Sequence, residues 1–135
     1  MALIRVLLDT SAYSSFMRGH PELKVALQRA EEIFITPIVL GELHAGFLHG
    51  SRLKKNRREL EMFLSSPRVG VLSIDDETAT RYALIVESLR EAGTPIPTND
   101  IWIAASAMQY GLPILSTDAH YRHVRQVLVE DYGTR

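Results

Sequence analysis

Four acidic residues stand at positions where carboxylates commonly do chemistry. Asp9 ends an apolar run, residues 4–8, and Asp118 follows a second apolar run near the end of the chain. Glu42 and Asp100 fall in the first or second turns of predicted helices. Ligands of open α/β sheets bind outside the carboxyl ends of the strands, so the four side chains converge if the sheet is parallel. We therefore predict one acidic site.

Four converging carboxylates would repel one another strongly. Two unit charges about 4 Å apart repel by about 4 kcal/mol at an effective dielectric constant near 20. Such a site is tolerable only if some carboxylates are protonated or if cations hold them together. Oxygen ligands without cysteine or histidine favour the hard ions Mg²⁺ or Mn²⁺ over Zn²⁺. Because such ions activate water and stabilise charge on phosphorus, the predicted cofactor indicates phosphoryl chemistry.

Each carboxylate also has a purely structural explanation. Asp100 and Asp118 could lie in the first turns of helices, where a carboxylate gains about 0.3–1 kcal/mol from the helix dipole. Glu42 could pair with an arginine, and Asp9 could cap the turn that follows its strand. Taken singly, these explanations are as good as a metal site. Only the convergence of all four residues favours the site.

The elements that must position these side chains follow an alternating pattern. Five short apolar runs predict strands at residues 4–8, 33–35, 69–72, 112–116 and 127–129, and residues 130–135 are predicted to form a frayed tail. Consecutive apolar residues indicate strands buried on both faces, and alternation with helices indicates parallel pairing. We predict an α/β fold, a three-layer α/β/α sandwich with a central parallel sheet of about five strands, in a single domain over residues 1–135.

The composition excludes several classes of protein. The chain has 135 residues, 46% of them hydrophobic and 23% charged, which is ordinary for a globular domain. It has no cysteine, so disulfides, thiolate metal sites and thiol catalysis are excluded, and the expected location is cytoplasmic. No segment approaches the roughly 20 apolar residues of a membrane span, and no secretory signal is visible. We expect no membrane partner.

Basic residues are concentrated in two places despite a formal net charge of −1. A solvated helix face and a phosphate-binding patch both explain such a pattern, and the sequence leaves both open. The candidate substrate contacts are Arg52, Lys54, Lys55, Arg57 and Arg58 in one stretch, and Arg122 and Arg125 near the end.

Four short segments, spread over nearly the whole chain, carry a family resemblance. They are Leu8-Asp9-Thr10-Ser11, Val39-Leu40-Gly41-Glu42-Leu43, Asn99-Asp100-Ile101-Trp102-Ile103-Ala104-Ala105 and Leu115-Ser116-Thr117-Asp118-Ala119-His120-Tyr121. In this order, and at this chain length, they resemble the PIN-domain family, specifically the VapC-type ribonuclease toxins. Two departures are slight: Gly41 replaces a common Ser or Ala, and Tyr121 replaces the usual Phe. Neither removes a carboxylate.

The resemblance implies a magnesium-dependent endoribonuclease, the toxin of a toxin–antitoxin module. Asp9 and Asp100 match the family's principal metal ligands, and Glu42 and Asp118 match its remaining acidic pair. The polar neighbours placed to hydrogen-bond to ligands or waters are Thr10, Ser11, Asn99 and Thr117. The implied partners are an RNA substrate, a VapB-like antitoxin that blocks the site, and a second copy of the chain in a homodimer.

The mechanism that we hypothesise is in-line hydrolysis of an RNA phosphodiester by metal-activated water. It leaves a 5′-phosphate and needs neither a histidine base nor the 2′-hydroxyl. The pair His120 and His123, one helical turn apart, lacks a metal-binding motif and is predicted to be structural or on the surface.

Rival interpretations remain. An aspartyl-phosphate phosphatase would use Asp9 as nucleophile, but Ser11 stands where its second acid belongs. A receiver domain would need a late strand-end lysine, and none follows Lys55. A catalytically inactive family member that binds RNA or a partner is the third alternative.

Overall fold

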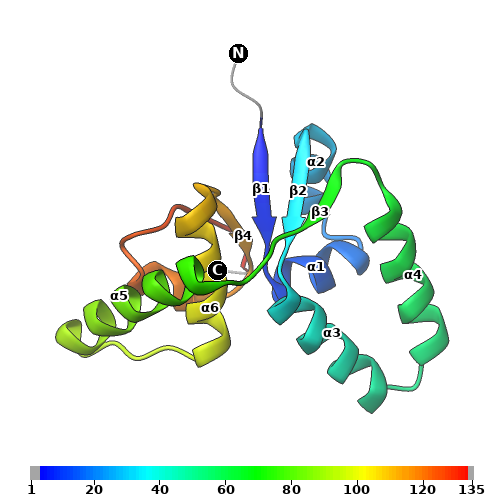
Figure 1. Cartoon of the computed structure of the whole chain (residues 1–135). Coiled ribbons are helices and arrows are strands. Elements are labelled where there is room, and N and C mark those ends of the chain that lie inside the picture. The colour runs from blue at the N-terminus through cyan, green and yellow to red at the C-terminus, as the bar shows by residue number, and fades with distance from the viewer. Residues whose placement is uncertain (1–3, 134–135) are drawn as a thin grey trace.

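A five-stranded parallel sheet forms the centre of the structure, a computed structural model that describes residues 4–133 (Figure 1). The strands are β1 (Arg5–Leu8), β2 (Glu32–Ile35), β3 (Val69–Val71), β4 (Ile114–Ser116) and β5 (Val129–Asp131). Their order in the sheet is β3-β2-β1-β4-β5, and every neighbouring pair is parallel. The predicted parallel sheet is confirmed.

Helices cover both faces of this sheet. They are α1 (Thr10–Met17), α2 (Pro21–Arg29), α3 (Pro37–His49), α4 (Leu53–Ser65), α5 (Asp76–Ala92), α6 (Thr98–Tyr110) and the 3₁₀ helix η1 (Ala119–His123). One core cluster joins α1 and α2 to the sheet, and the other gathers α3, α4, α5 and α6. The three-layer α/β/α sandwich is therefore confirmed. Within residues 4–133, no helix combines the length and apolar character needed to cross a bilayer.

The central strand β1 is buried on both sides, as its apolar run predicts. Val6 and Leu8 face the core cluster that contains α1 and α2, whereas Leu7 faces the other cluster. Leu7 and Leu8 are fully buried. Because β1 lies between β2 and β4 as well, the residue that follows it, Asp9, emerges at the middle of the sheet's carboxyl edge.

Helix caps set where each site residue falls. Thr36 accepts a 3.2 Å hydrogen bond from the Val39 backbone N–H, and Pro37 begins α3. This start places Glu42 in the second turn of α3, on the same side as the start of α1. Pro97 precedes α6 and leaves Asp100 in its first turn.

The prediction for the last strand was wrong by two residues. The apolar run 127–129 predicted a strand followed by a frayed tail, but β5 begins at Val129 and includes Glu130 and Asp131. Its register pairs Val129 with Ile114 and Asp131 with Ser116. Leu128, which lies in the predicted strand, is 76% exposed. Because β5 is an edge strand that pairs only with β4, its limits are set by the register with β4 and not by its own apolar residues. Residues 134–135 of the predicted tail lie outside the described residues.

Candidate active site

Asp9 is a buried carboxylate that also caps a helix. One oxygen, Oδ1, accepts hydrogen bonds from the Ala12 backbone N–H at 2.8 Å and from the Ser11 hydroxyl at 2.8 Å. The other, Oδ2, accepts a 2.6 Å hydrogen bond from the hydroxyl of Ser116 at the end of β4. The residue is only 3% exposed. The first turn of α1 and the end of the neighbouring strand thus hold the carboxylate in one orientation.

Glu42 is held from two other elements. The hydroxyl of Thr10, the first residue of α1, donates to Glu42 Oε1 at 2.6 Å. The amide of Asn99, in the first turn of α6, donates to Glu42 Oε2 at 3.3 Å. Both oxygens are therefore oriented by donors from helices that begin at the same edge of the sheet.

Asp100 and Asp118 meet at a histidine. Nδ1 of His120 lies 2.8 Å from Asp100 Oδ2 and 3.0 Å from Asp118 Oδ1. Among the described residues, these three side chains form a group whose donor atoms all lie within 4.8 Å of one another. The hydroxyl of the buried Tyr121 donates to Asp100 Oδ1 at 3.4 Å. Asp118 caps η1 by accepting from the His120 backbone N–H at 2.8 Å.

Burial and mutual repulsion shift the acidity of these groups. Burial raises the pKa of Asp9 from 3.8 to about 6, against hydrogen bonds from Ser116 and Ser11 that lower it, and the charge of Asp100 adds to the rise. Burial also raises the pKa of Asp100, and the charges of Asp118 and Glu42 raise it further. After burial, the same four carboxylates raise the pKa of the Tyr121 phenol. The four negative charges therefore act on one region.

The set of donors fits a hard divalent cation. Among residues 4–133, none of the four carboxylates forms an ion pair with lysine or arginine, and His120 is the only basic side chain paired with any of them. Carboxylate oxygens at this density, without cationic side chains to neutralise them, are what Mg²⁺ or Mn²⁺ prefers.

The structure brings the predicted polar neighbours into this region by different routes. Thr10, Ser11 and Asn99 contact the carboxylates through their side chains. Thr117 enters the network through its backbone N–H, which donates to the Ser11 hydroxyl at 3.0 Å.

Sequence reasoning missed Ser116 and His120. Ser116 is fully buried, and its hydroxyl also accepts a 2.8 Å hydrogen bond from the Asp118 backbone N–H. Its place at a strand end was visible, but the pairing of β4 with β1 that turns it toward Asp9 was not. For His120, the usable signal was its place two residues after an acidic candidate.

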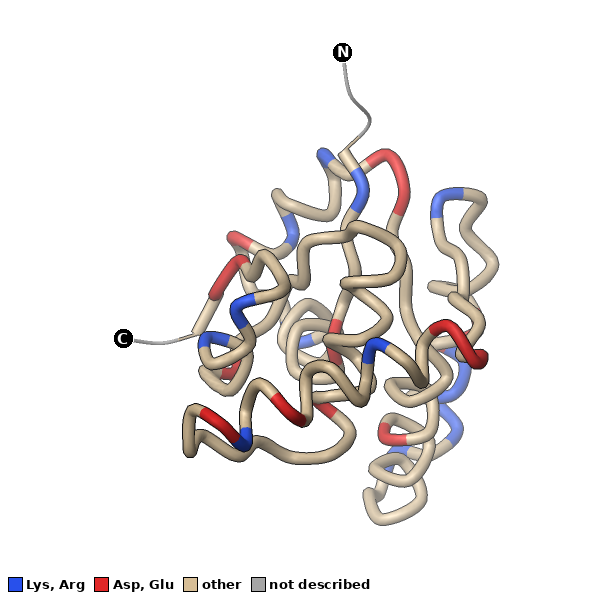
Figure 2. Tube along the Cα trace, turned by 60° about the vertical axis from the view of Figure 1, so that its left-hand side comes forward, with Lys and Arg blue, Asp and Glu red and all other residues tan. Residues whose placement is uncertain are grey.

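The two groups of basic residues lie in different surroundings. Arg122 and Arg125 line a pocket of about 300 Å³ together with Asp118 and Asp131, so they adjoin the acidic site. The exposed basic residues of the 52–58 stretch lie at the start of α4, on the side of the molecule away from α5 (Figures 1 and 2). Arg52 and Lys55 line a different pocket, of about 530 Å³, between α1, α3 and α4.

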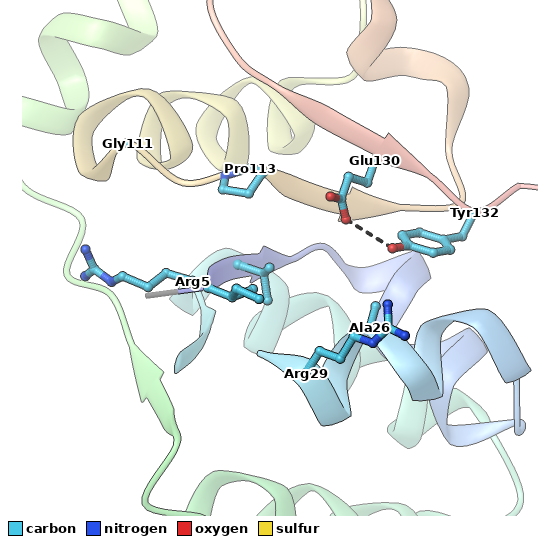
Figure 3. Close-up of a pocket in the computed structure, with 9 residues that line it drawn as sticks. Arg5, Ala26, Arg29, Gly111, Pro113, Glu130 and Tyr132 are labelled. Carbon is cyan, nitrogen blue, oxygen red and sulfur yellow. Dashed lines mark hydrogen bonds between the residues drawn. The ribbon is translucent and has the colours of Figure 1, made fainter. Parts of the chain in front are cut away.

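A larger cavity, of about 770 Å³, lies away from these carboxylates. It is bounded by α2 and the start of β1, where Arg5 and Arg29 approach it, and by Tyr132, whose hydroxyl donates to Glu130 at 3.0 Å (Figure 3). None of the four acidic residues lines it. The size of a cavity therefore does not identify the chemical site in this protein.

The fold and the acidic site together define a class: α/β sandwiches with carboxylates gathered at the carboxyl edge of a parallel sheet. Within that class, residues 6–127 match the family model of the PIN domain. The chain belongs to the PIN domain family.

Relatives and solved structures agree with this assignment. Ribonuclease VapC4 of Mycobacterium tuberculosis is 36% identical over 95 residues, which are 70% of this chain and 73% of the relative. Ribonuclease VapC5 of the same organism is 31% identical over 111 residues, 82% of this chain and 81% of the relative. The structure of VapBC2 from Rickettsia felis bound to a promoter DNA fragment contains a chain of the same fold, with a TM-score of 0.82, 22% identity and coverage of 95% and 98%.

Proposed function

We propose that this protein is a metal-dependent endoribonuclease, the toxin of a toxin–antitoxin module. The observation that carries the proposal is the convergence of Asp9, Glu42, Asp100 and Asp118 from four separate elements. The names of the relatives, which are VapC ribonucleases, support RNA as the substrate.

The four carboxylates would hold Mg²⁺ or Mn²⁺, with Asp9 and Asp100 as the principal ligands. A bound ion of this kind supplies activation of the attacking water and stabilisation of charge on the phosphate. The protein supplies orientation: Ser11 and Ser116 hold Asp9. Such support of ligands is usually worth 10–100-fold in metal affinity or activity.

Two hydrogen-bonding residues orient Glu42 in the same way. Thr10 and Asn99 hold the two oxygens of Glu42. Held by these two donors, Glu42 would bind the ion either directly or through an ordered water. The product would carry a 5′-phosphate.

The RNA backbone would lie beside Asp118. Arg122 and Arg125 line the pocket that adjoins this carboxylate and carry the positive charge that a phosphate requires. The basic stretch of α4 is a second, more distant candidate for RNA contacts.

The proposed partner is a VapB-like antitoxin that covers the site. Its support is that the similar structures are VapBC complexes, one of them bound to promoter DNA. The homodimer implied by the family resemblance is checked by measuring the mass of the purified protein in solution.

The decisive experiment maps cleavage ends in total RNA. Wild-type protein with Mg²⁺ should create new 5′-phosphate ends, and a chelator should remove them. Asp100→Asn should abolish cleavage while circular dichroism shows an intact fold. Cleavage that persists in Asp100→Asn, or in excess chelator, would contradict the proposed site. RNA binding without cleavage by the wild type would favour the inactive binding module instead.

A further inference from the structure

A histidine stands among the carboxylates of the proposed metal site. His120 is the first basic side chain after the η1 cap, and its Nδ1 lies 2.8 Å from Asp100 Oδ2 and 3.0 Å from Asp118 Oδ1. Its side chain remains 46% exposed, whereas that of Asp100 is 14% exposed. The ring thus enters the site from its solvent side.

The backbone fixes the ring in this place. Asp118 Oδ1, which lies 3.0 Å from Nδ1, also accepts a 2.8 Å hydrogen bond from the His120 backbone N–H. The carboxylate and the imidazole are therefore held to each other by the first turn of η1. Asp100 comes from α6, so the ring also bridges two elements.

The distances from His120 Nδ1 to the two carboxylate oxygens match the spacing of neighbouring donors around an octahedral ion. Donors at right angles and about 2.1 Å from an ion are about 3.0 Å apart. The two measured separations from Nδ1, 2.8 and 3.0 Å, lie close to this value. An ion placed among these atoms would take the place of the hydrogen bonds that His120 now makes, with the same side-chain atoms around it.

We propose that Nδ1 of His120 is a metal ligand that makes this site prefer Mn²⁺ to Mg²⁺. The inference rests on the proposed metal-dependent function. Mg²⁺ and Mn²⁺ both suit carboxylate and water oxygens, but Mn²⁺ is a first-row transition ion and accepts an imidazole nitrogen more readily than Mg²⁺ does. Replacing one oxygen position by nitrogen therefore raises the affinity for Mn²⁺ relative to Mg²⁺.

The test uses Mn²⁺ alone, bound to the metal-stripped full chain without RNA. Electron spin-echo spectroscopy of bound Mn²⁺ should show coupling to one ¹⁴N nucleus, and ¹⁵N-histidine labelling should shift it. The coupling should vanish in His120→Ala. It should persist in His123→Ala, a matched control from the same 3₁₀ helix that is outside the three-donor group.

Titration calorimetry measures the affinities for Mn²⁺ and Mg²⁺ and so tests the predicted preference. His120→Ala should weaken Mn²⁺ binding by about 10-fold or more and Mg²⁺ binding by about 3-fold or less. Mn²⁺ that binds the wild type without nitrogen coupling, or with coupling that survives in His120→Ala, would overturn this inference and leave the proposed nuclease intact. A wild type that binds neither ion would overturn both.

Discussion

The hydroxyl of Ser116, at the end of β4, lies 2.6 Å from Oδ2 of Asp9, at the end of the adjacent strand β1. The two residues are 107 positions apart in sequence and both are buried. Parallel pairing brings them together, because it sets the carboxyl ends of β1 and β4 side by side. The same hydroxyl accepts the Asp118 backbone N–H, so one side chain links two of the four carboxylate-bearing residues.

Ser116→Ala should destabilise the protein by about 1–3 kcal/mol, because it removes one hydrogen bond to a buried carboxylate oxygen of Asp9 and the acceptor of the Asp118 backbone N–H. Chemical denaturation measures the loss. Ser106→Ala is the matched control, since that buried hydroxyl donates only to the Trp102 carbonyl of its own helix at 3.1 Å. Equal losses of unfolding free energy in the two variants would show that the hydrogen bond from Ser116 to Asp9 contributes no more to stability than the one inside α6.

Asp9→Asn should stabilise the metal-free protein at neutral pH. The folded state raises the pKa of Asp9 from 3.8 to about 6, so it holds this proton more tightly than the unfolded chain does. The corresponding stability is full below pH 3.8 and is lost as the pH rises through about 6. Asparagine carries no charge to bury, so the variant should gain about 1–3 kcal/mol above pH 6.

Thermal or chemical unfolding in excess chelator measures this difference between Asp9→Asn and wild type. The gain should shrink towards zero near pH 4, where both side chains are neutral in the folded state. A difference that stays constant from pH 4 to pH 7.5 would exclude burial of the Asp9 charge as its cause.

Thr10→Val should reduce RNA cleavage by about 10-fold or more with little change in stability. Valine keeps the shape of threonine but cannot donate to Glu42 Oε1, which the Thr10 hydroxyl meets at 2.6 Å. Thr10→Ser retains a hydroxyl and should restore most of the rate. Initial cleavage rates at saturating Mg²⁺ provide the comparison, and a Thr10→Ser variant as slow as Thr10→Val would reject the hydrogen bond as the cause.

Arg122→Ala combined with Arg125→Ala should weaken RNA binding and flatten its dependence on salt. Two lost phosphate contacts on single-stranded RNA reduce the slope of log K against log salt by about 1.4. Binding is best measured in an Asp100→Asn background to prevent cleavage. The control is Arg81→Ala with Arg90→Ala on α5, where both arginines pair with neighbouring glutamates. An unchanged slope in the Arg122→Ala, Arg125→Ala variant would show that these residues do not contact the RNA backbone.

The sheet could be predicted because its central strands are decided locally. Consecutive apolar residues such as Val6, Leu7 and Leu8 are typical of a strand that is buried on both faces. Helical segments with their own caps separate these runs along the chain. The carboxyl edge then follows from parallel pairing, which is why the sequence alone predicts Asp9 and Asp118 at the same edge of the sheet.

What the sequence could not show depends on pairing between distant segments. The limits of β5 are set by β4, and the apolar Val127 and Leu128 favour a strand two residues too early. The orientation of Ser116 depends on its register with β1. His120 reaches Asp100 only because η1 begins beside α6. Local patterns contain none of these relationships.

The last described residues lie closer to the acidic site than the first described residues do. Residue 4 directly precedes β1, a whole strand away from Asp9, whereas the Tyr132 N–H donates to the carbonyl of Ser116 at 2.8 Å. An affinity tag or fluorescent fusion joined ahead of β1 therefore leaves the edge that carries the acidic residues open. The same attachment after Gly133 would crowd the proposed site, and cleavage assays on such material would then understate the activity that we propose.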